Sequence, residues 1–549
     1  MIQTPVQAPD PYAPAPTLWQ RHPALAWVLA VFVLTVGLMV LAFPPLNKGE
    51  AAYVLALPAI LWAHRRPAFR LYAWTVLGAQ AVAWTILLWW LHNVTWAGLF
   101  LLGPFVGLLT GLWYLAAWWT IPRLKGHHAI SRIIAMLGLA GLWVVLEWVR
   151  SQLFGGFPWL PLAASQWQRP FILQVAAYGG AGVTSFILIT FNLGAAAYVH
   201  RAFFEGVTGF KKRTPEFSIA LLVLMAGSFP FLGDSFNQQR RPLVHAALVQ
   251  PYIPQNQKWD AAFATTVLET LEQVTLAANK RGAPDLIVWP EAVTPWPLFR
   301  EANVQPWLEY IARKTGKPLL LGSVAAVNHG PREDWYNGAF VVDPLTGLAA
   351  EHYYKRKLVP FGEYIPMRPV LGWLEKVVPI GGDFIPGRSA APLPVPVGRN
   401  QVKVGVLVCY EDIFPALARD SVQAGAEVLA VLTNNAWYGE GGAAYQHAAH
   451  SVLRAIENRR PVIRCGNGGW SGWIDEFGNI RVTVSNDAGS VYFRGAQTVT
   501  VSQDARWSQR LSFYTQHGDW FLVVCVALSL VTYYLALTLR PKPAGEPGF

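Results

Sequence analysis

The chain has 549 residues, of which 53% are hydrophobic and only 14% are charged, and 26 of them are tryptophan. Soluble domains carry about 25% charged residues, so this composition excludes an ordinary soluble protein and indicates a membrane protein or a membrane–soluble hybrid. The net charge of +11 does not indicate nucleic-acid binding, because no basic run is longer than a few residues and many charges lie between apolar stretches.

The N-terminal half has the pattern of a membrane domain. Residues 1–23 are rich in proline and lack periodicity, which predicts a disordered cytoplasmic tail. A helix needs about 20 apolar residues to cross a bilayer, and most of the apolar stretches within 24–242 reach that length. A final span and a second cytoplasmic tail are expected in residues 511–549. The predicted bundle of about eight spans uses the stretches 24–43, 51–64, 71–91, 95–121, 129–149, 172–199, 217–232 and 519–539.

The charges in the loops orient this bundle. The loops 64–70, 122–132 and 200–216 are basic, whereas the alternate loops carry few Lys or Arg residues. Cytoplasmic loops hold the excess of Lys and Arg, so both chain ends are expected in the cytoplasm. Seven crossings then place the interval between the seventh and eighth spans on the outer face of the membrane.

That interval, residues 243–510, has the pattern of a soluble α/β domain. Short apolar runs such as DLIVWPE (285–291) and VKVGVLVCYE (402–411) alternate with helical patterns. Function in open α/β sheets lies at the carboxyl ends of the strands. Three of the predicted strands end in polar or reactive residues, namely Glu291, Cys409 and Asn434.

Three segments of this domain could together carry acyl transfer through a thioester. A glutamate at a strand end, Glu291, could take the proton of the Cys409 thiol. Lys355 could balance the charge on the tetrahedral oxygen, helped by the backbone N–H of Tyr410. The segment that carries Lys355 also carries Glu363.

Each of these residues also has a structural interpretation. An isolated cysteine in a strand is most often a packed small hydrophobe, and Glu291 could be a turn carboxylate. Lys355 could pair with Glu351, four residues earlier. A Cys409–Cys465 disulfide stays open if the domain lies in an oxidising compartment. The sequence shows no metal-ligand spacing and no Gly-rich phosphate loop, so no metal or cofactor is expected.

The order WPE (Glu291), YYKRKLVPFGE (Lys355) and VCYE (Cys409) resembles the carbon–nitrogen hydrolase, or nitrilase, superfamily. Further motifs make the chain similar to the apolipoprotein N-acyltransferase family over nearly its whole length beyond the tail. These motifs are EWVRSQLFGGFPWLPLAASQ (147–166), VQPYIPQNQKWD (249–260), KLVPFGEYIP (357–366) and NNAWYG (434–439). The resemblance implies a polytopic helical membrane bundle joined to a nitrilase-like αββα sandwich.

The resemblance also implies an activity. Cys409 would take an acyl chain from a phospholipid, typically phosphatidylethanolamine, and pass it to the N-terminal amine of a diacylglyceryl-cysteine on an apolipoprotein. Glu291 would be the general base and Lys355 the oxyanion stabiliser. Glu363, Tyr410 and Glu411 would support the site. The chain would lie in a bacterial inner membrane as a multi-pass protein, with the catalytic domain on the periplasmic side.

Residue matching further implies four substrate-binding positions and two departures from the family pattern. The substrate positions are Trp259, Asn337, Tyr354 and Trp437. The departures are Lys357, where the family has a histidine, and Asn435, where it has an aspartate. They leave the three catalytic residues intact and concern lid or substrate contacts.

The segment 358–387 is too hydrophobic for an ordinary surface loop. Large exposed apolar patches mark membranes or partners, so we expect a mobile lid that dips into the outer leaflet, with a helix packed on the domain core as the alternative. Substitution of Trp373 or Leu374 should then slow acyl transfer. Two other functions remain open: a membrane-anchored nitrilase-type amidase that acts on a small amide, and a catalytically inactive scaffold.

Overall fold

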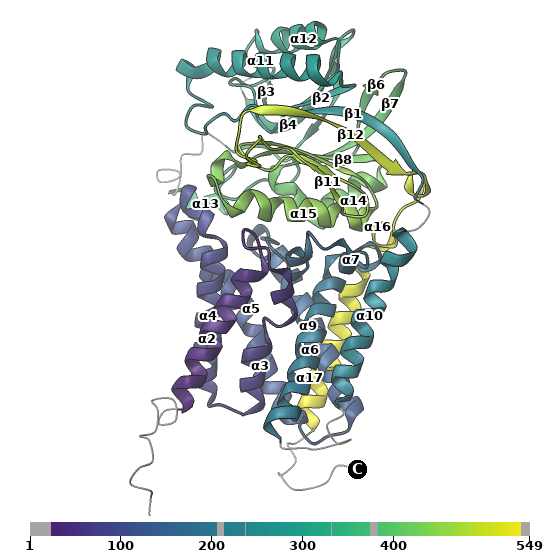
Figure 1. Cartoon of the computed structure of the whole chain (residues 1–549). Helices are drawn as coiled ribbons and strands as arrows, with labels where there is room; N and C mark the ends of the chain where they lie inside the picture. The colour runs from purple at the N-terminus through teal and green to yellow at the C-terminus, as the bar shows by residue number, and fades with distance from the viewer. Residues whose placement is uncertain (1–22, 206–213, 236–237, 331, 374–382, 540–549) are drawn as a thin grey trace, which may run out of the picture.

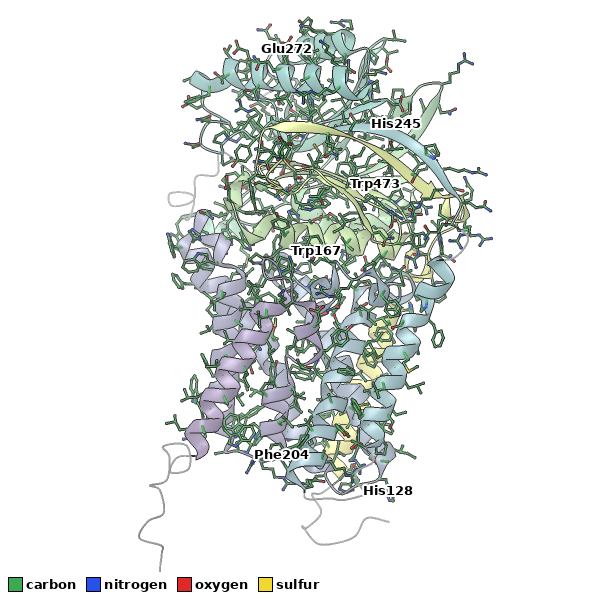
Figure 2. All side chains as sticks on the ribbon, viewed as in Figure 1. His128, Trp167, Phe204, His245, Glu272 and Trp473 are labelled. Atoms are coloured by element: carbon green, nitrogen blue, oxygen red, sulfur yellow. The ribbon has the colours of Figure 1, made fainter. Side chains whose placement is uncertain are left out.

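The computed structural model describes residues 23–205, 214–235, 238–330, 332–373 and 383–539. The predicted N-terminal tail lies outside these residues except for Pro23, and most of the predicted C-terminal tail lies outside them as well. The molecule has two stacked parts, a helical bundle and a domain with two sheets (Figure 1). Phe204 and His128 mark the far end of the bundle, and Glu272 lies at the opposite end of the molecule (Figure 2).

Five helices of the described chain are long and apolar enough to cross a membrane. They agree with the predicted stretches at 24–43, 95–121, 129–149, 172–199 and 519–539. Uninterrupted runs of apolar residues give these helices side chains that suit lipid on their outer faces. They are α2 (Pro23–Ala42), α5 (Trp96–Leu124), α6 (Ala129–Gln152), α9 (Ala181–Phe204) and α17 (Trp520–Thr538).

The three other predicted stretches also form helices of the bundle. Residues 51–64 fold as η1 (Gly49–Tyr53) and α3 (Leu57–His64), and eight residues of α3 are too few to cross a bilayer. The stretches 71–91 and 217–232 form α4 (Phe69–Leu87) and α10 (Pro215–Ser235), which pack along α5 and α9. The apolar stretches therefore located the long helices of the bundle, and they overstated how many helices have the length and hydropathy of a full span.

The span predicted at 172–199 begins later than expected. Two short helices, α7 (Pro170–Leu173) and α8 (Ala176–Gly179), precede α9, which starts at Ala181. Gly180 interrupts the helix with a φ of +76°, and a Cβ atom there would lie 2.8 Å from the Tyr514 ring. Only glycine adopts this conformation without strain, so the break is encoded by Gly180.

The catalytic candidate residues lie in a sandwich of two six-stranded sheets. One sheet has the order β12-β1-β2-β3-β4-β5 and the other the order β11-β10-β9-β8-β7-β6. In each sheet three central strands are parallel and the flanking pairs are antiparallel.

The first sheet contains β1 (Arg240–Gln250), β2 (Leu286–Val288), β3 (Leu319–Asn328), β4 (Glu333–Asp343), β5 (Gly347–Tyr354) and β12 (Gly495–Asp504). The second contains β6 (Leu393–Val397), β7 (Asn400–Val408), β8 (Val428–Asn434), β9 (Val462–Asn467), β10 (Gly472–Ile474) and β11 (Ile480–Thr483).

Alternation along the strands builds the layers of this sandwich. Ala246 and Leu248 of β1 face the second sheet, whereas Ala247 and Val249 pack under α11 (Ala264–Gly282) and α12 (Val304–Thr315). On the second sheet the outer face is covered by α14 (Pro415–Gln423) and α15 (Gly442–Asn458). The resulting four-layer αββα architecture is the one that the family resemblance implies.

Helix α15 joins the two parts of the molecule, because it lies between the second sheet and the top of the bundle (Figure 1). Gln446 on this helix makes four hydrogen bonds to the bundle. Its Oε1 accepts from the indole N–H groups of Trp90 (3.0 Å) and Trp159 (2.9 Å), and its Nε2 donates to the carbonyls of Pro44 (3.0 Å) and Leu87 (2.9 Å). This polar junction fixes the domain on the bundle.

Candidate active site

Cys409 lies at the carboxyl end of β7, where the strand turns sharply into η8 (Cys409–Ile413). Its side chain is buried and its φ is +50°. A non-glycine residue in the left-handed region costs about 1–3 kcal/mol and is typical of functional sites. The turn therefore holds Cys409 in a left-handed backbone conformation that is less favourable than that of a strand. A cysteine that only filled space in the core would not require this conformation.

Glu291 follows β2 across the sandwich and faces this thiol. Its carboxylate interacts with the Cys409 thiol, and its Oε2 accepts from the backbone N–H of Asn434 at 2.9 Å. Burial would raise the pKa of Glu291, but the nearby ammonium groups of Lys355 and Lys258, together with the hydrogen bond from the Asn337 amide, lower it. The carboxylate is thus ionised and able to accept a proton.

Lys355 follows β5 and lies between two carboxylates. Its Nζ is 2.9 Å from Glu363 Oε1 and 3.4 Å from Glu291 Oε1. Burial would lower the pKa of Lys355, but the charges of Glu363 and Glu291 outweigh burial and raise it. The amide Nδ2 of Asn337 donates to the same two oxygens, at 2.8 and 2.9 Å, and so fixes the carboxylates on either side of a permanent cation.

The protonation state of the Cys409 thiol decides which chemistry this arrangement supports. Burial and the neighbouring Glu291 charge raise the pKa of Cys409 to about 12, although Lys355 opposes them. The residue therefore rests as a thiol at neutral pH, and it needs a base within hydrogen-bond reach to become a nucleophile. Glu291 meets that requirement by its contact and its charge.

Glu411 lies behind the nucleophile and ties its turn to the segment that carries Lys355. The carboxylate accepts four hydrogen bonds, from the backbone N–H groups of Val408, Arg356 and Lys357 and from the Tyr353 hydroxyl, at 2.6–3.1 Å. Tyr410 points the other way, and its hydroxyl donates to the Gly156 carbonyl of the bundle at 2.7 Å. Its backbone N–H lies in the first turn of η8, where amide groups lack an intrahelical acceptor.

A second buried charge cluster, which the sequence did not reveal, supports the same turn. Asp412 is fully buried and contacts His447 at 2.8 Å, Arg464 at 2.6 Å and the Ser451 hydroxyl at 2.7 Å. His447 Nε2 also lies 3.2 Å from the Cys409 carbonyl oxygen. Sequence patterns miss this cluster because its members lie on η8, α15 and β9, and only the fold brings them together.

Two of the residues expected to bind substrate flank the site and are half exposed. Trp259 is 49% exposed and follows Lys258, and Trp437 is 47% exposed on η9 (Asn435–Tyr438). Tyr354 packs away from the thiol, with its ring stacked on Tyr336 at a centroid distance of 4.1 Å.

The residues at which the sequence departs from the family pattern lie next to the site. The Lys357 ammonium lies 4.9 Å from the centre of the Phe414 ring. Asn435 Oδ1 accepts a hydrogen bond from the Thr433 hydroxyl at 2.9 Å.

All three cysteines are free, and Cys465 donates to the Val249 and Val288 carbonyls at 3.3 Å. The Cys409–Cys465 disulfide therefore does not form.

Sequence reasoning missed two residues that touch the reactive groups. Lys258 is buried and its Nζ donates to the Glu291 carbonyl at 3.1 Å. Tyr438 lies next to the Cys409 thiol, and its ring centroid lies 4.5 Å from that of Trp90. Both residues lie inside motifs that carry the family resemblance, one position away from Trp259 and Trp437, which are expected to bind substrate.

Comparisons with known proteins divide the chain in the same way as the structure. Residues 245–505 match the carbon–nitrogen hydrolase family, and residues 35–194 match the apolipoprotein N-acyltransferase N-terminal domain. The apolipoprotein N-acyltransferase of Geobacter metallireducens is 34% identical over 518 residues, which cover 92% of this chain and 94% of that protein. The one from Chlorobaculum tepidum is 27% identical and covers 92% and 95%. An amidase of the nitrilase superfamily from Nesterenkonia AN1 aligns with 51% of this chain and 95% of its own, at 20% identity and a TM-score of 0.36.

Proposed function

Because this chain belongs to the apolipoprotein N-acyltransferase family, we propose that Cys409 is the residue that carries the acyl chain. The protein is a membrane acyltransferase that acts in lipoprotein maturation, with a phospholipid as donor and a lipoprotein as acceptor. We further propose phosphatidylethanolamine as the donor and the α-amine of a diacylglyceryl-cysteine as the acceptor. The contact of Glu291 with a protonated, buried thiol carries the proposal.

In the first half-reaction Glu291 removes the thiol proton while the sulfur attacks the ester carbonyl of the phospholipid. The negative charge that forms on the carbonyl oxygen lies near the Lys355 ammonium and the N–H groups at the start of η8. The intermediate then expels the lysophospholipid alkoxide, which takes the proton from Glu291. The products are a thioester on Cys409 and a lysophospholipid.

In the second half-reaction the amine attacks this thioester. Lys355 again faces the oxyanion, and Glu291 again accepts a proton as the new C–N bond forms. Collapse of the intermediate breaks the C–S bond, and the departing sulfur recovers a proton from Glu291. The amide product leaves, and the enzyme returns to its starting state.

The position of the site against the bundle supports a lipid donor. Tyr410 bonds to Gly156 of the bundle, and the Tyr438 carbonyl accepts from Asn93 at 2.8 Å. In the segment that follows Glu363, Met367, Val370 and Trp373 are 63–69% exposed, and such a group of apolar side chains suits a lipid surface. We propose that this part of the segment 358–387 is the lid; residues 374–382, including Leu374, lie outside the described residues. A small-amide hydrolase would have no use for these features.

The orientation of the protein is also a proposal. The basic loops next to His128 and Phe204 lie at the end of the bundle away from the two-sheet domain (Figure 2), which supports a catalytic domain on the periplasmic side of a bacterial inner membrane. The domain limits 24–242, 243–510 and 511–549 are part of the same proposal. Labelling of an introduced surface cysteine by an impermeant maleimide in intact spheroplasts tests it, and labelling only after lysis would contradict it.

A two-substrate assay tests the function. Purified protein receives a phospholipid with a labelled acyl chain together with a synthetic diacylglyceryl-cysteine peptide or, separately, a small aliphatic amide. We expect labelled peptide from wild type, none from Cys409→Ala, and no amide hydrolysis. Hydrolysis of the amide without transfer to the peptide would overturn the proposal.

A further inference from the structure

Lys258 is a second lysine in the catalytic centre, and its surroundings differ from those of Lys355. It lies in the segment after β1, is about 1% exposed, and donates to the backbone carbonyl of Glu291 at 3.1 Å. Lys355 touches two carboxylates, whereas Lys258 forms no ion pair within the described part of the chain. An ammonium group has three N–H donors, so the fold places a nearly unpartnered amine beside the general base.

The environment of Lys258 makes its neutral amine accessible near neutral pH, although the ammonium form still predominates at pH 7. Burial lowers its pKa to about 8, although the charges of Glu291 and Cys409 oppose that shift. These two groups lie near enough to act on the Lys258 charge, and Lys355 and Glu363 are linked to the same Glu291 carboxylate. The α-amine of a peptide has a pKa of about 7.7–8.0, so the two amines have nearly equal proton affinity.

The second half-reaction requires two proton removals. The acceptor amine reaches the site largely as an ammonium ion, which has no lone pair to attack a thioester. One proton must leave before attack and a second as the C–N bond forms. Glu291 takes only one of them, because its carboxylate must be free when the C–N bond forms.

We propose that the Lys258 amine accepts the first of these protons from the incoming acceptor ammonium. This inference rests on the proposed Cys409 thioester. The neutral Lys258 Nζ removes a proton from the ammonium ion and becomes an ammonium itself. The freed amine attacks the thioester carbonyl, Glu291 takes the second proton and returns it to the departing Cys409 sulfur, and Lys258 releases its proton to water.

The position of the Lys258 amine also supports this role. The Glu291 carbonyl fixes the Lys258 amine next to the base that acts in the following step. Trp259, the next residue, is half exposed and its ring lies 5.7 Å from the Lys258 Nζ. Lys258 thus contacts both the half-exposed ring of Trp259 and the backbone of the buried general base.

The test separates the two half-reactions in full-length protein. Wild type, Lys258→Met, Lys258→Arg and the exposed-lysine control Lys280→Met are first acylated with phospholipid, and the Cys409 thioester is measured by mass spectrometry. Diacylglyceryl-cysteine peptide is then added in a single turnover between pH 6.5 and 9.5. Hydroxylamine, which is largely unprotonated at neutral pH, serves as an acceptor that needs no proton removal before attack.

We expect Lys258→Met and Lys258→Arg to slow peptide transfer about 100-fold at pH 7, in the range for loss of a general base. The deficit should shrink toward pH 9.5, where the peptide arrives as free amine, and discharge by hydroxylamine should fall much less. Normal transfer by Lys258→Arg would show that a fixed charge suffices and would overturn the proposal. A deficit that is constant with pH, or failure of both variants to form the thioester, would also overturn it. Absence of a thioester in wild type would instead refute the proposed function.

Discussion

Glu411→Gln tests whether the carboxylate behind the nucleophile holds the site together. Each carboxylate oxygen accepts two hydrogen bonds, so an amide NH₂ group at either position leaves at least one buried backbone N–H without an acceptor. An unpaired buried N–H costs about 1–3 kcal/mol, and loss of the negative charge weakens the remaining bonds by about 1 kcal/mol more. The free energy of unfolding should therefore fall by about 2–4 kcal/mol.

The same substitution should separate Lys355 from Cys409, because Glu411 joins their two segments. A displacement of about 1 Å costs on the order of 100-fold in rate. Differential scanning fluorimetry should show a Tm lower by about 4–16 °C, and acyl-enzyme formation should slow by about 100-fold. Glu427→Gln is the control, because its carboxylate accepts from the Lys403 N–H at an exposed position. A Tm within about 2 °C of wild type with an unchanged acylation rate would refute this reasoning.

Three further predictions follow from the same contacts. Asp412→Asn should destabilise the protein by about 3–5 kcal/mol, since it leaves the buried Arg464 charge without its partner; an unchanged Tm would contradict this. Gln446→Leu removes four hydrogen bonds at the junction with the bundle and should speed proteolysis between domain and bundle, whereas equal cleavage rates would show that the junction is held by packing. Lys355 and Lys258 keep the pKa of Glu291 below 4.5, so acylation should stay constant as the pH falls to about 5 and be lost below that as the base becomes protonated; a loss centred near pH 7 in a stopped-flow profile would assign the base elsewhere.

The family resemblance implied the αββα fold, whereas the reactive positions of Glu291 and Cys409 could be predicted from the sequence for a physical reason. Glu291 and Cys409 each follow a strand whose last residues are buried and apolar, whereas Lys355 follows β5, most of whose residues are only partly buried or exposed. Glu363 was found because it lies eight residues after Lys355 in the same segment. Such features can be recognised in the sequence because each depends on residues that are close together in the chain.

Other features could not be predicted because they depend on contacts across the fold. Gln446 reads as one polar residue of a helix, and only the packed structure shows its four partners in the bundle. Asp412, His447 and Arg464 are far apart in the chain, and each alone looks like an ordinary surface charge. Residues 51–64 look like a span by composition, but the 3₁₀ turn of η1 uses part of that length and leaves α3 with eight residues.

Lys258 shows the limit of motif matching. It stands in the quoted motif VQPYIPQNQKWD, yet a lysine beside a tryptophan gives no sign in sequence of whether it is buried. Burial, the contact with Glu291 and the absence of an ion pair among the described residues are properties of the fold. They distinguish it from the exposed lysines of the same domain.

The most direct test of the central claim is mass spectrometry of the protein after incubation with a phospholipid that carries a defined acyl chain. Wild type and Cys409→Ala are compared, and half of each sample is treated with neutral hydroxylamine, which cleaves thioesters. We expect the acyl mass on the Cys409 peptide of wild type, its loss with hydroxylamine, and no adduct in the variant. An unmodified Cys409 peptide from folded wild-type protein, or an acyl mass on another residue, would contradict the account.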